Sequence, residues 1–359
     1  MSTKVSAPLY AYSSVSGFCP IGVEPDESTP KKSGSRLMSK LDRLFSPRSA
    51  APSSPADAIA AKNPANAINE SQPEEVPTSI SLRILTWNIW FETLYKEQRT
   101  TALVETIKSL DPLPDVCCFQ ECTPRFELHL QENDWWRKTW AMTKCADQSA
   151  VTHYSYGTMV FVRRELIERL GFKVKSWFEP FEVSQTGRGL LVLELTPPKS
   201  KHPLLIATSH MDYTPEIRAT QFASAISTLS ATPTSVFCGD TNIDTYPELQ
   251  PLLSAGYVDS WLETNPDFAT SPDLREVGVT FGTVGLRGSS MPNMDGPPRR
   301  LDYVMTRGMK VTKCELIGGE LIPKENWATD SDEEDEELDL EVYVSDHLGV
   351  LVDVQLLPL

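Results

Sequence analysis

The chain has 359 residues with 33 basic and 49 acidic side chains, which give a formal net charge of −16 at pH 7. Hydrophobic residues make up 40% of the sequence, enough for a substantial core, while the excess of acid opposes non-specific binding to nucleic acid. Together these values exclude a wholly disordered protein, a basic nucleic-acid-binding module and a small disulfide-stabilised scaffold.

The first 80 residues differ in composition from the rest. They carry eight basic and eight acidic residues and are rich in Pro, Ser and Ala, so they have too few apolar residues to offset the entropy of folding. We therefore expect a disordered tail over residues 1–80. Within it, residues 35–46 place Leu37, Leu41 and Phe45 on one helical face with basic residues between them. This segment is either a transient helix without function or a binding site for a protein partner or an anionic lipid surface.

From residue 82 onward, short apolar runs alternate with helical patterns. The apolar runs predict strands at residues 82–89, 115–120, 157–162, 190–195, 204–209, 235–238, 301–305 and 348–354. Helical spacing predicts helices at residues 95–110, 124–130 and 215–229. Because buried strands are mixed with helices throughout, we expect one α/β domain over residues 81–359, with sheet packed on sheet and helices outside.

An acidic segment lies near the C-terminus. Nine of the residues from 330 to 341 are Asp or Glu, and we expect an acidic loop at about 324–343 because neighbouring carboxylates repel and cannot pack. The sequence leaves three roles open: a plain solvated loop, an electrostatic gate or nucleic-acid mimic beside the site, and a target for an acidophilic kinase at Thr329 or Ser331.

Neither a signal peptide nor a transmembrane segment is predicted. The N-terminus lacks an apolar stretch of signal-peptide length, and no run reaches ~18 apolar residues. The seven Cys residues show no repeated zinc-type spacing, so we expect reduced thiols and no zinc site. These features predict an intracellular protein, in the nucleus, the cytoplasm or both.

Polar side chains follow several of the predicted strands at the point where the apolar run ends. They are Asn88, Glu121, His210, Asp240 with Asn242, Asp302 and His347. In open α/β folds, ligands gather outside strand ends, so these groups are expected to converge. Carboxylate and amide oxygens suit Mg²⁺, and the absence of a His/Cys cluster argues against zinc. A cation, a water-orienting carboxylate and an imidazole are the parts needed for metal-assisted hydrolysis of a phosphoester.

Six short motifs resemble, in order, those of the endonuclease/exonuclease/phosphatase superfamily. They are Thr86-Trp87-Asn88, Gln120-Glu121, Ser209-His210, Gly239-Asp240-Thr241-Asn242, Arg300-Leu301-Asp302-Tyr303 and Ser345-Asp346-His347. Within the superfamily, the chain is most similar to the tyrosyl-DNA phosphodiesterase 2 branch. The resemblance implies a four-layer αββα sandwich, in which two packed mixed β-sheets are flanked by helices and hold one active site.

The resemblance also implies which residues hold a metal and activate water. Glu121 would bind Mg²⁺, or Mn²⁺ as a substitute, and Asp346 would complete the metal shell. Asn88 would help to hold the metal or the phosphate. Asp240 would position or deprotonate the attacking water, and Asn242 would contact the phosphoryl oxygens.

The resemblance assigns the imidazoles to the phosphate itself. His347 would stabilise the transition-state charge as imidazolium, with Asp302 holding its ring by a hydrogen bond. A carboxylate beside an imidazole favours its charged form, in agreement with that role. His210 would contact the scissile phosphate.

Two positions depart from the tyrosyl-DNA phosphodiesterase 2 branch. Trp90 stands where the branch commonly has an acidic residue, which either thins the metal shell or supplies a ring that stacks on substrate. Asp244 stands where the branch tends to have a basic residue, so a DNA strand is less well held there. Arg188, Arg299 and Arg300 are candidates to supply the missing positive charge.

Three functions remain open at this point. The first is a Mg²⁺-dependent phosphodiesterase that removes a 5′-phosphotyrosyl or related 5′-linked adduct from DNA in DNA repair, acting as a monomer. The second keeps the chemistry but acts on a phospholipid headgroup, a phosphoinositide or another small phosphoester, as the net acidity and Asp244 suggest. The third is an inactive scaffold that binds partners through its tail and its acidic loop.

Overall fold

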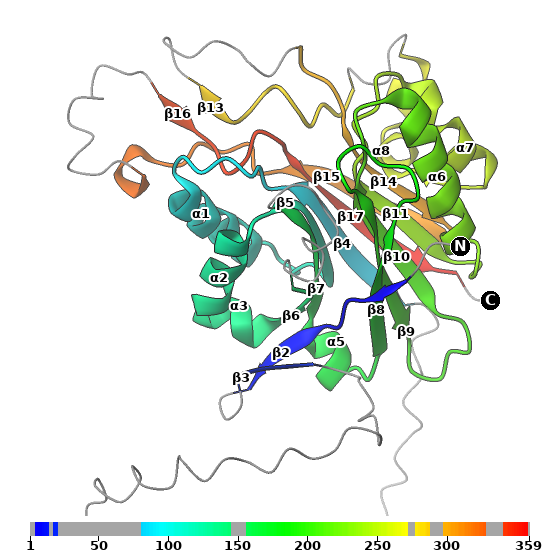
Figure 1. The fold of residues 1–359 in the computed structure, drawn as a ribbon, viewed down its shortest axis with the longest axis horizontal. Helices are drawn as coiled ribbons and strands as arrows, with labels where there is room; N and C mark the ends of the chain where they lie inside the picture. Colours follow the sequence, from blue (N-terminus) through cyan, green and yellow to red (C-terminus); the bar gives the residue numbers. More distant parts are fainter. Residues whose placement is uncertain are drawn as a thin grey trace, which may run out of the picture. The chain divides into compact units, whose positions relative to one another are not determined.

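Two β-sheets pack face to face in the middle of the structure (Figure 1). The computed structural model describes residues 4–13, 17–20, 80–144, 156–271, 277–287, 297–327 and 340–357. These residues all belong to the compact unit formed by Met1–Val23 and Ser79–Leu359. The amphipathic segment 35–46 and residues 328–339 of the expected acidic loop lie outside the described residues.

The larger sheet has eight strands among the described residues. In spatial order they are β15 (Met309–Ile317), β17 (Gly349–Leu356), β4 (Ser81–Asn88), β5 (Val116–Cys122), β7 (Gly157–Arg163), β6 (Trp140–Met142), β2 (Tyr10–Ser13) and β3 (Gly17–Pro20). Strands β4 and β5 run parallel, whereas the other neighbours are antiparallel. Each strand of the parallel pair therefore ends at the same edge of the sheet.

The second sheet has seven strands within the described ranges. In spatial order they are β1 (Val5–Ser6), β8 (Lys173–Pro180), β9 (Gly189–Thr196), β10 (Leu204–His210), β11 (Ser235–Asp240), β14 (Asp302–Arg307) and β12 (Val258–Asp259). Here β10 and β11 form the parallel pair. A short two-stranded ribbon of β13 (Leu286–Arg287) and β16 (Glu341–Val342) lies apart from both sheets.

Helices cover the outer faces of the two sheets. On the side of the eight-stranded sheet lie α1 (Lys96–Lys108), α2 (Pro124–Glu132) and α3 (Asp134–Thr139), whereas α5 (Arg164–Glu168) follows β7 and places Leu166 in the cluster between the sheets. On the other side lie α6 (Pro215–Leu229) and α7 (Gln250–Ser254), whereas α8 (Ser260–Thr264) packs against β14 and β15, one strand of each sheet. Three single 3₁₀ turns, η1 (Tyr246–Leu249), η2 (Pro266–Thr270) and η3 (Lys324–Asn326), complete the described elements. None of the described helices combines the length and the apolar character needed to cross a membrane.

Three apolar clusters fill the three interfaces between these layers. The central cluster joins the sheets through residues such as Ile84 and Ile206. A second cluster packs Leu103 of α1 against the outer face of the larger sheet. The third packs Phe222 of α6 against Phe237 of β11. The predicted four-layer αββα sandwich is thereby confirmed.

A buried amide joins the two sheets at the edge where the strands end. Gln120 on β5 donates from Nε2 to Oγ1 of Thr86 on β4, at 3.0 Å, and to Oγ1 of Thr208 on β10, at 2.9 Å. Since a buried amide without partners is costly, these bonds fix how the ends of β4, β5 and β10 face one another.

The N-terminal residues correct the expectation of a disordered tail beginning at residue 1. Val5 and Ser6 pair with Phe178 and Trp177 of β8, while Ala7 and Leu9 are buried in the central cluster. The pairing with β8 makes this short stretch a strand, and the average composition of 80 residues conceals its few apolar residues. Within the expected acidic loop, η3 and β16 likewise show regular structure at either end.

Candidate active site

Four of the predicted polar residues lie at the carboxyl ends of the two parallel strand pairs. Asn88 ends β4, Glu121 lies near the end of β5, His210 ends β10 and Asp240 ends β11. Because parallel strands end at one edge of a sheet and the sheets are packed together, the four side chains gather in one place.

Two antiparallel strands begin at the same edge. Asp302 is the first residue of β14 and pairs with Asp240 in the sheet register. His347 lies two residues before β17, which pairs with β4. The indole Nε1 of Trp87 donates to the carbonyl oxygen of His347 at 2.9 Å, and thus holds the histidine backbone at this edge.

Unusual backbone geometry concentrates around the cluster. Glu121 and Asn242 adopt positive φ angles of 59° and 50°, in a left-handed region that is sparsely populated by residues other than Gly and often marks functional sites. Gly239 has a φ of 131°, and a Cβ there would lie 2.0 Å from the carbonyl oxygen of Ser209. Gly239 therefore lets β11 approach β10 closely enough to set Asp240 beside His210.

The carboxylate of Asp240 is the centre of the cluster. It accepts a hydrogen bond from Nδ2 of Asn88 at 2.9 Å and one from the backbone N–H of Asn242 at 3.0 Å. Its Oδ2 lies 3.4 Å from Nε2 of His210 and 3.8 Å from Nε2 of His347. Burial raises the pKa of Asp240 to about 6, although the charge of His347 opposes that shift. A carboxylate with such a pKa binds a proton from water more readily than an exposed Asp does.

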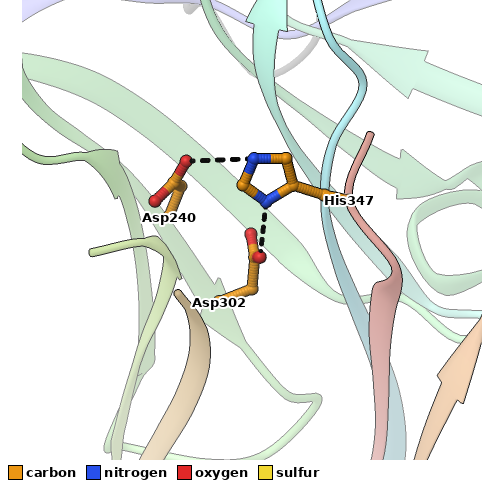
Figure 2. Close-up of side chains that lie close together, drawn as sticks. All are labelled: Asp240, Asp302 and His347. Carbon is orange, nitrogen blue, oxygen red and sulfur yellow. Dashed lines mark hydrogen bonds and ion pairs between the residues drawn. The ribbon is translucent and has the colours of Figure 1, made fainter. Parts of the chain in front are cut away.

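His347 lies between two carboxylates, as Figure 2 shows. Nδ1 of His347 is 2.7 Å from Oδ2 of Asp302, and Nε2 faces Asp240. Burial alone would lower the pKa of His347, but Asp302, Asp346 and Asp240 together raise it well above its usual value. The ring is therefore the charged imidazolium, and Nδ1–H donates to Asp302.

The surroundings of His210 shift its pKa in the opposite direction. It is buried, and burial, with the charges of Arg188 and His347, lowers its pKa well below the usual value. Among the described residues its Nδ1 has no hydrogen-bond partner, and this atom lies 3.8 Å from Oε1 of Glu121. A neutral, buried ring with an unused nitrogen is suited to contact a ligand in the cluster.

The oxygen-rich composition of the cluster fits a divalent cation such as Mg²⁺. Glu121, Asp240, Asp302 and Asp346 are all buried, and His347 supplies one positive charge against them. Ligand atoms of Asp240, Asp302 and His347 lie within 4.8 Å of one another. However, a protonated His347 bound to Asp302 is no metal ligand. The assignment of the ion to Glu121 and Asp346 stays a prediction.

Asn88 faces the cluster with its donor groups. Its Nδ2 donates to Asp240 and, at 3.2 Å, to Oε1 of Glu121, while its Oδ1 accepts from the backbone N–H of Trp90 at 3.0 Å. In this orientation both N–H groups and the oxygen of the Asn88 amide have partners within the protein, so Asn88 holds Glu121 and Asp240 in place. Its two predicted roles, holding the metal or holding the phosphate, stay predictions.

The three arginines predicted to bind substrate lie in different environments. Arg188 is buried near His210, and its Nη2 donates to the hydroxyl of Tyr156 at 3.3 Å. Arg299 lies at the rim, with its guanidinium 5.5 Å from the centre of the Phe281 ring, which itself contacts His347.

The structure corrects the prediction that Arg300 binds the substrate. Its guanidinium is buried and forms two bonds to Asp259, at 2.7 and 3.3 Å, and it packs over the ring of Tyr303 at 4.4 Å. The bidentate pair uses the donors that a phosphate would need. Arg300 is therefore part of the folded framework and not a substrate contact.

Trp90 and Asp244, the two departures from the branch, have partners within the protein. The guanidinium of Arg99 packs against the Trp90 ring at 4.5 Å, so one face of this predicted stacking residue is already covered. Asp244 pairs at 2.7 Å with Arg218, which is fully buried and also binds Glu248 at 2.8 Å. One guanidinium therefore serves two carboxylates, and the group keeps one negative charge in excess.

Sequence reasoning missed two buried cations behind the cluster. Arg99 of α1 donates to the carbonyl oxygens of Ile89 and Val344, both at 3.1 Å, and Lys96 donates to Ile89 at 3.3 Å. Burial, and next the charge of Arg99, lower the pKa of Lys96 to about 7. The helical spacing of the sequence could have identified both residues, because Lys96 and Arg99 lie on the same buried face of α1 as Leu103.

We expect Asp302 to act through His347. His347→Gln should lower the turnover number by about 10²–10³-fold, because it removes a preorganised positive charge. Asp302→Asn should give a smaller loss, and the double variant should be no slower than His347→Gln alone. Steady-state hydrolysis of bis(p-nitrophenyl) phosphate by the four proteins measures this; losses that add up would show that Asp302 has its own contact with substrate.

Comparison with known proteins agrees with this fold. The zebrafish (D. rerio) TDP2 structure described as complexed with a single-strand DNA product has a TM-score of 0.56 and 21% identity, over 76% of this chain and 98% of that chain. Truncated TDP2 of Caenorhabditis elegans has a TM-score of 0.54 and 18% identity, over 76% of this chain and 97% of that one. A mannosyl-6-phosphatase of Bacteroides thetaiotaomicron also has a TM-score of 0.54, with 15% identity over 76% and 99% of the two chains. A search of curated protein sequences finds no significant match.

The fold and the cluster of carboxylates, amide and imidazoles define a hydrolase class that acts on phosphoester bonds. The sequence profile of the Endonuclease/Exonuclease/phosphatase family matches residues 85–347. This match spans most of the chain, from the first strand of the cluster to His347. The chain belongs to that family.

Proposed function

We propose that this protein is a Mg²⁺-dependent phosphodiesterase that removes a 5′-phosphotyrosyl or related 5′-linked adduct from DNA. The observation that carries the proposal is the pairing of a buried carboxylate of raised pKa, Asp240, with a charged imidazole, His347, at 3.8 Å. One group accepts a proton from water and the other stabilises negative charge on phosphorus, and hydrolysis of a phosphoester needs both.

The residues of the cluster divide this work between them. Asp240 takes a proton from the attacking water, whose oxygen forms the new bond to phosphorus as the bond to the tyrosine oxygen breaks. His347 presents an N–H group to a phosphoryl oxygen, while Asn88 and the backbone N–H of Asn242 orient the carboxylate of Asp240. When bound by Glu121 and Asp346, a Mg²⁺ ion supplies additional positive charge to a phosphoryl oxygen.

Three observations support a DNA adduct as the substrate. The motifs resemble the tyrosyl-DNA phosphodiesterase 2 branch, and the zebrafish TDP2 structure of similar fold holds a single-strand DNA product. Asp244, which would repel a DNA strand, is paired with Arg218. On this basis we propose a role in DNA repair, in the nucleus or the cytoplasm, for a protein that acts as a monomer.

A small phosphoester, such as a sugar phosphate or a phosphoinositide headgroup, is the second candidate substrate. The similarity of fold to a bacterial mannosyl-6-phosphatase favours it, as does the net charge of −16. Such a substrate needs only the local cluster and no long basic groove.

Hydrolysis of a 5′-tyrosyl oligonucleotide tests the proposal. We expect turnover with Mg²⁺ or Mn²⁺, complete loss of activity in EDTA and recovery on adding Mg²⁺. EDTA removes the cation that Glu121 is expected to hold and that would neutralise a phosphoryl oxygen. Glu121→Gln should be inactive, whereas the exposed Glu105→Gln should retain full activity. Mannose 6-phosphate and a phosphoinositide are assayed beside the oligonucleotide. A strong preference for either of them would replace the DNA substrate with the second candidate.

A further inference from the structure

A stack of aromatic rings lies beside the cluster. The Phe91 and Tyr156 rings are 4.9 Å apart and inclined by 15°, and the Tyr156 and His210 rings are 6.4 Å apart and inclined by 24°. Tyr213 meets His210 edge to face, also at 6.4 Å. His210 contacts Asp240, so the stack leads from the reacting centre outward.

The outer members of this stack are exposed. Phe91 is 45% exposed and Tyr213 is 58% exposed, whereas Tyr156 between Phe91 and His210 is only 7% exposed. Large aromatic side chains at the rim of a buried polar site contribute little to the core. Their open faces are available to a flat ligand group.

Hydrogen bonds hold the backbone of the two outer aromatic residues and the hydroxyl of Tyr156. The backbone N–H of Phe91 donates to Oε2 of Glu121 at 2.8 Å. This bond links the residue that carries the outer ring directly to the expected metal ligand. Arg218 donates to the carbonyl oxygen of Tyr213 at 2.6 Å, and Arg188 donates to the hydroxyl of Tyr156. The backbone that carries this aromatic platform of Phe91, Tyr156 and Tyr213 is thus held before a ligand arrives, which lowers the entropy cost of binding.

We propose that Phe91 and Tyr213 determine specificity by stacking on a flat aromatic group attached to the phosphate that the cluster hydrolyses. The inference rests on the proposed function and refines its substrate class. The aromatic group is either the base of the terminal nucleotide or the phenol of a tyrosyl adduct, since both present a π-face to a ring. A sugar phosphate has no such group and gains nothing from the platform.

Binding of three phosphates in the presence of Mg²⁺, measured by calorimetry, tests the proposal without relying on turnover. Thymidine 5′-monophosphate carries a base, O-phosphotyrosine carries a phenol, and mannose 6-phosphate carries neither. Phe91→Leu and Tyr213→Leu should each weaken at least one aromatic ligand by about tenfold, the usual effect of losing one stacking ring. Mannose 6-phosphate should bind these variants as it binds the unaltered protein.

Two further variants serve as controls. Tyr213→Phe keeps the ring and should bind all three ligands as the unaltered protein does. Phe268→Leu, at a position that is 46% exposed on η2, removes an exposed phenylalanine outside the stack and should have no effect. Circular dichroism and thermal melting of each variant check that the fold is kept.

The pattern of losses distinguishes the outcomes. A larger loss for thymidine 5′-monophosphate assigns the platform to the base, and a larger loss for O-phosphotyrosine assigns it to the phenol. Unchanged binding of both aromatic ligands, or an equal loss for mannose 6-phosphate, overturns the proposal. Binding that shows the aromatic preference in a protein without hydrolytic activity would keep the platform and reject the proposed function.

Discussion

Asp240→Asn should reduce the turnover number for phosphoester hydrolysis by about 10³-fold, within the range expected for loss of a general base. The substitution keeps the size of the side chain, and its single amide oxygen can accept from either Asn88 or Asn242, which donate to different oxygens of Asp240. It removes the negative charge and the ability to take a proton from water. Steady-state rates at saturating Mg²⁺ with bis(p-nitrophenyl) phosphate measure the effect.

A matched substitution on the surface provides the control. Asp267 is exposed on η2, so Asp267→Asn should retain the full rate. Melting temperatures of both variants separate loss of chemistry from loss of fold. More than a tenth of the original rate in Asp240→Asn would remove this residue from its role as the base.

Arg300→Met should lower the free energy of unfolding by about 3–5 kcal/mol, the cost of removing one partner from a buried ion pair. Arg300 and Asp259 are both buried, and their bidentate contact joins the segment before β14 to the end of β12. Met fills similar space but leaves the carboxylate of Asp259 without its cation. Asp259 also accepts from the N–H of Trp261 at the start of α8, so this helix should loosen as well.

Urea unfolding followed by circular dichroism measures the change. Arg125 forms an ion pair with Glu97 on the surface, where solvent screens the interaction, so Arg125→Met should change the stability little. An equally small effect in Arg300→Met would mean that the buried pair contributes no more than an exposed one, and would reopen a substrate role for Arg300.

The strand ends of the cluster could be predicted because each is a buried run that stops at a polar residue. Strands β8 and β15 could not, since both alternate polar and apolar residues and are partly exposed. Alternation of that kind over a few residues, as in Lys173–Pro180, does not distinguish a strand from a loop without the partner strand.

Neighbouring residues explain why some site predictions failed. Arg299 and Arg300 are adjacent in an extended segment, where successive side chains point to opposite sides. Arg299 therefore reaches Phe281 at the rim, whereas Arg300 points inward to Asp259. Only the pairing of Phe281 with Arg299 sets which arginine faces outward, and this long-range contact has no local signature.

The aromatic stack was missed for a related reason. Phe91, Tyr156 and Tyr213 come from three separate loops, and none belongs to a motif of the family resemblance. Tyr213 nevertheless lies three residues after His210, so its position beyond a strand end was visible in the sequence. Its exposure and its contact with the His210 ring became apparent only in the fold.

The bridge made by Gln120 sets the alignment on which catalysis depends. Asn88 and Glu121 belong to one sheet, whereas His210, Asp240 and Asp302 belong to the other. A slide of one sheet past the other by a single residue, ~3.3 Å, would carry Asp240 out of reach of Asn88. The hydrogen bond from Gln120 to Thr208 crosses this sliding interface, while the bond to Thr86 anchors the amide on its own sheet. An amide that takes no part in the reaction thus keeps the two halves of the reacting centre in register.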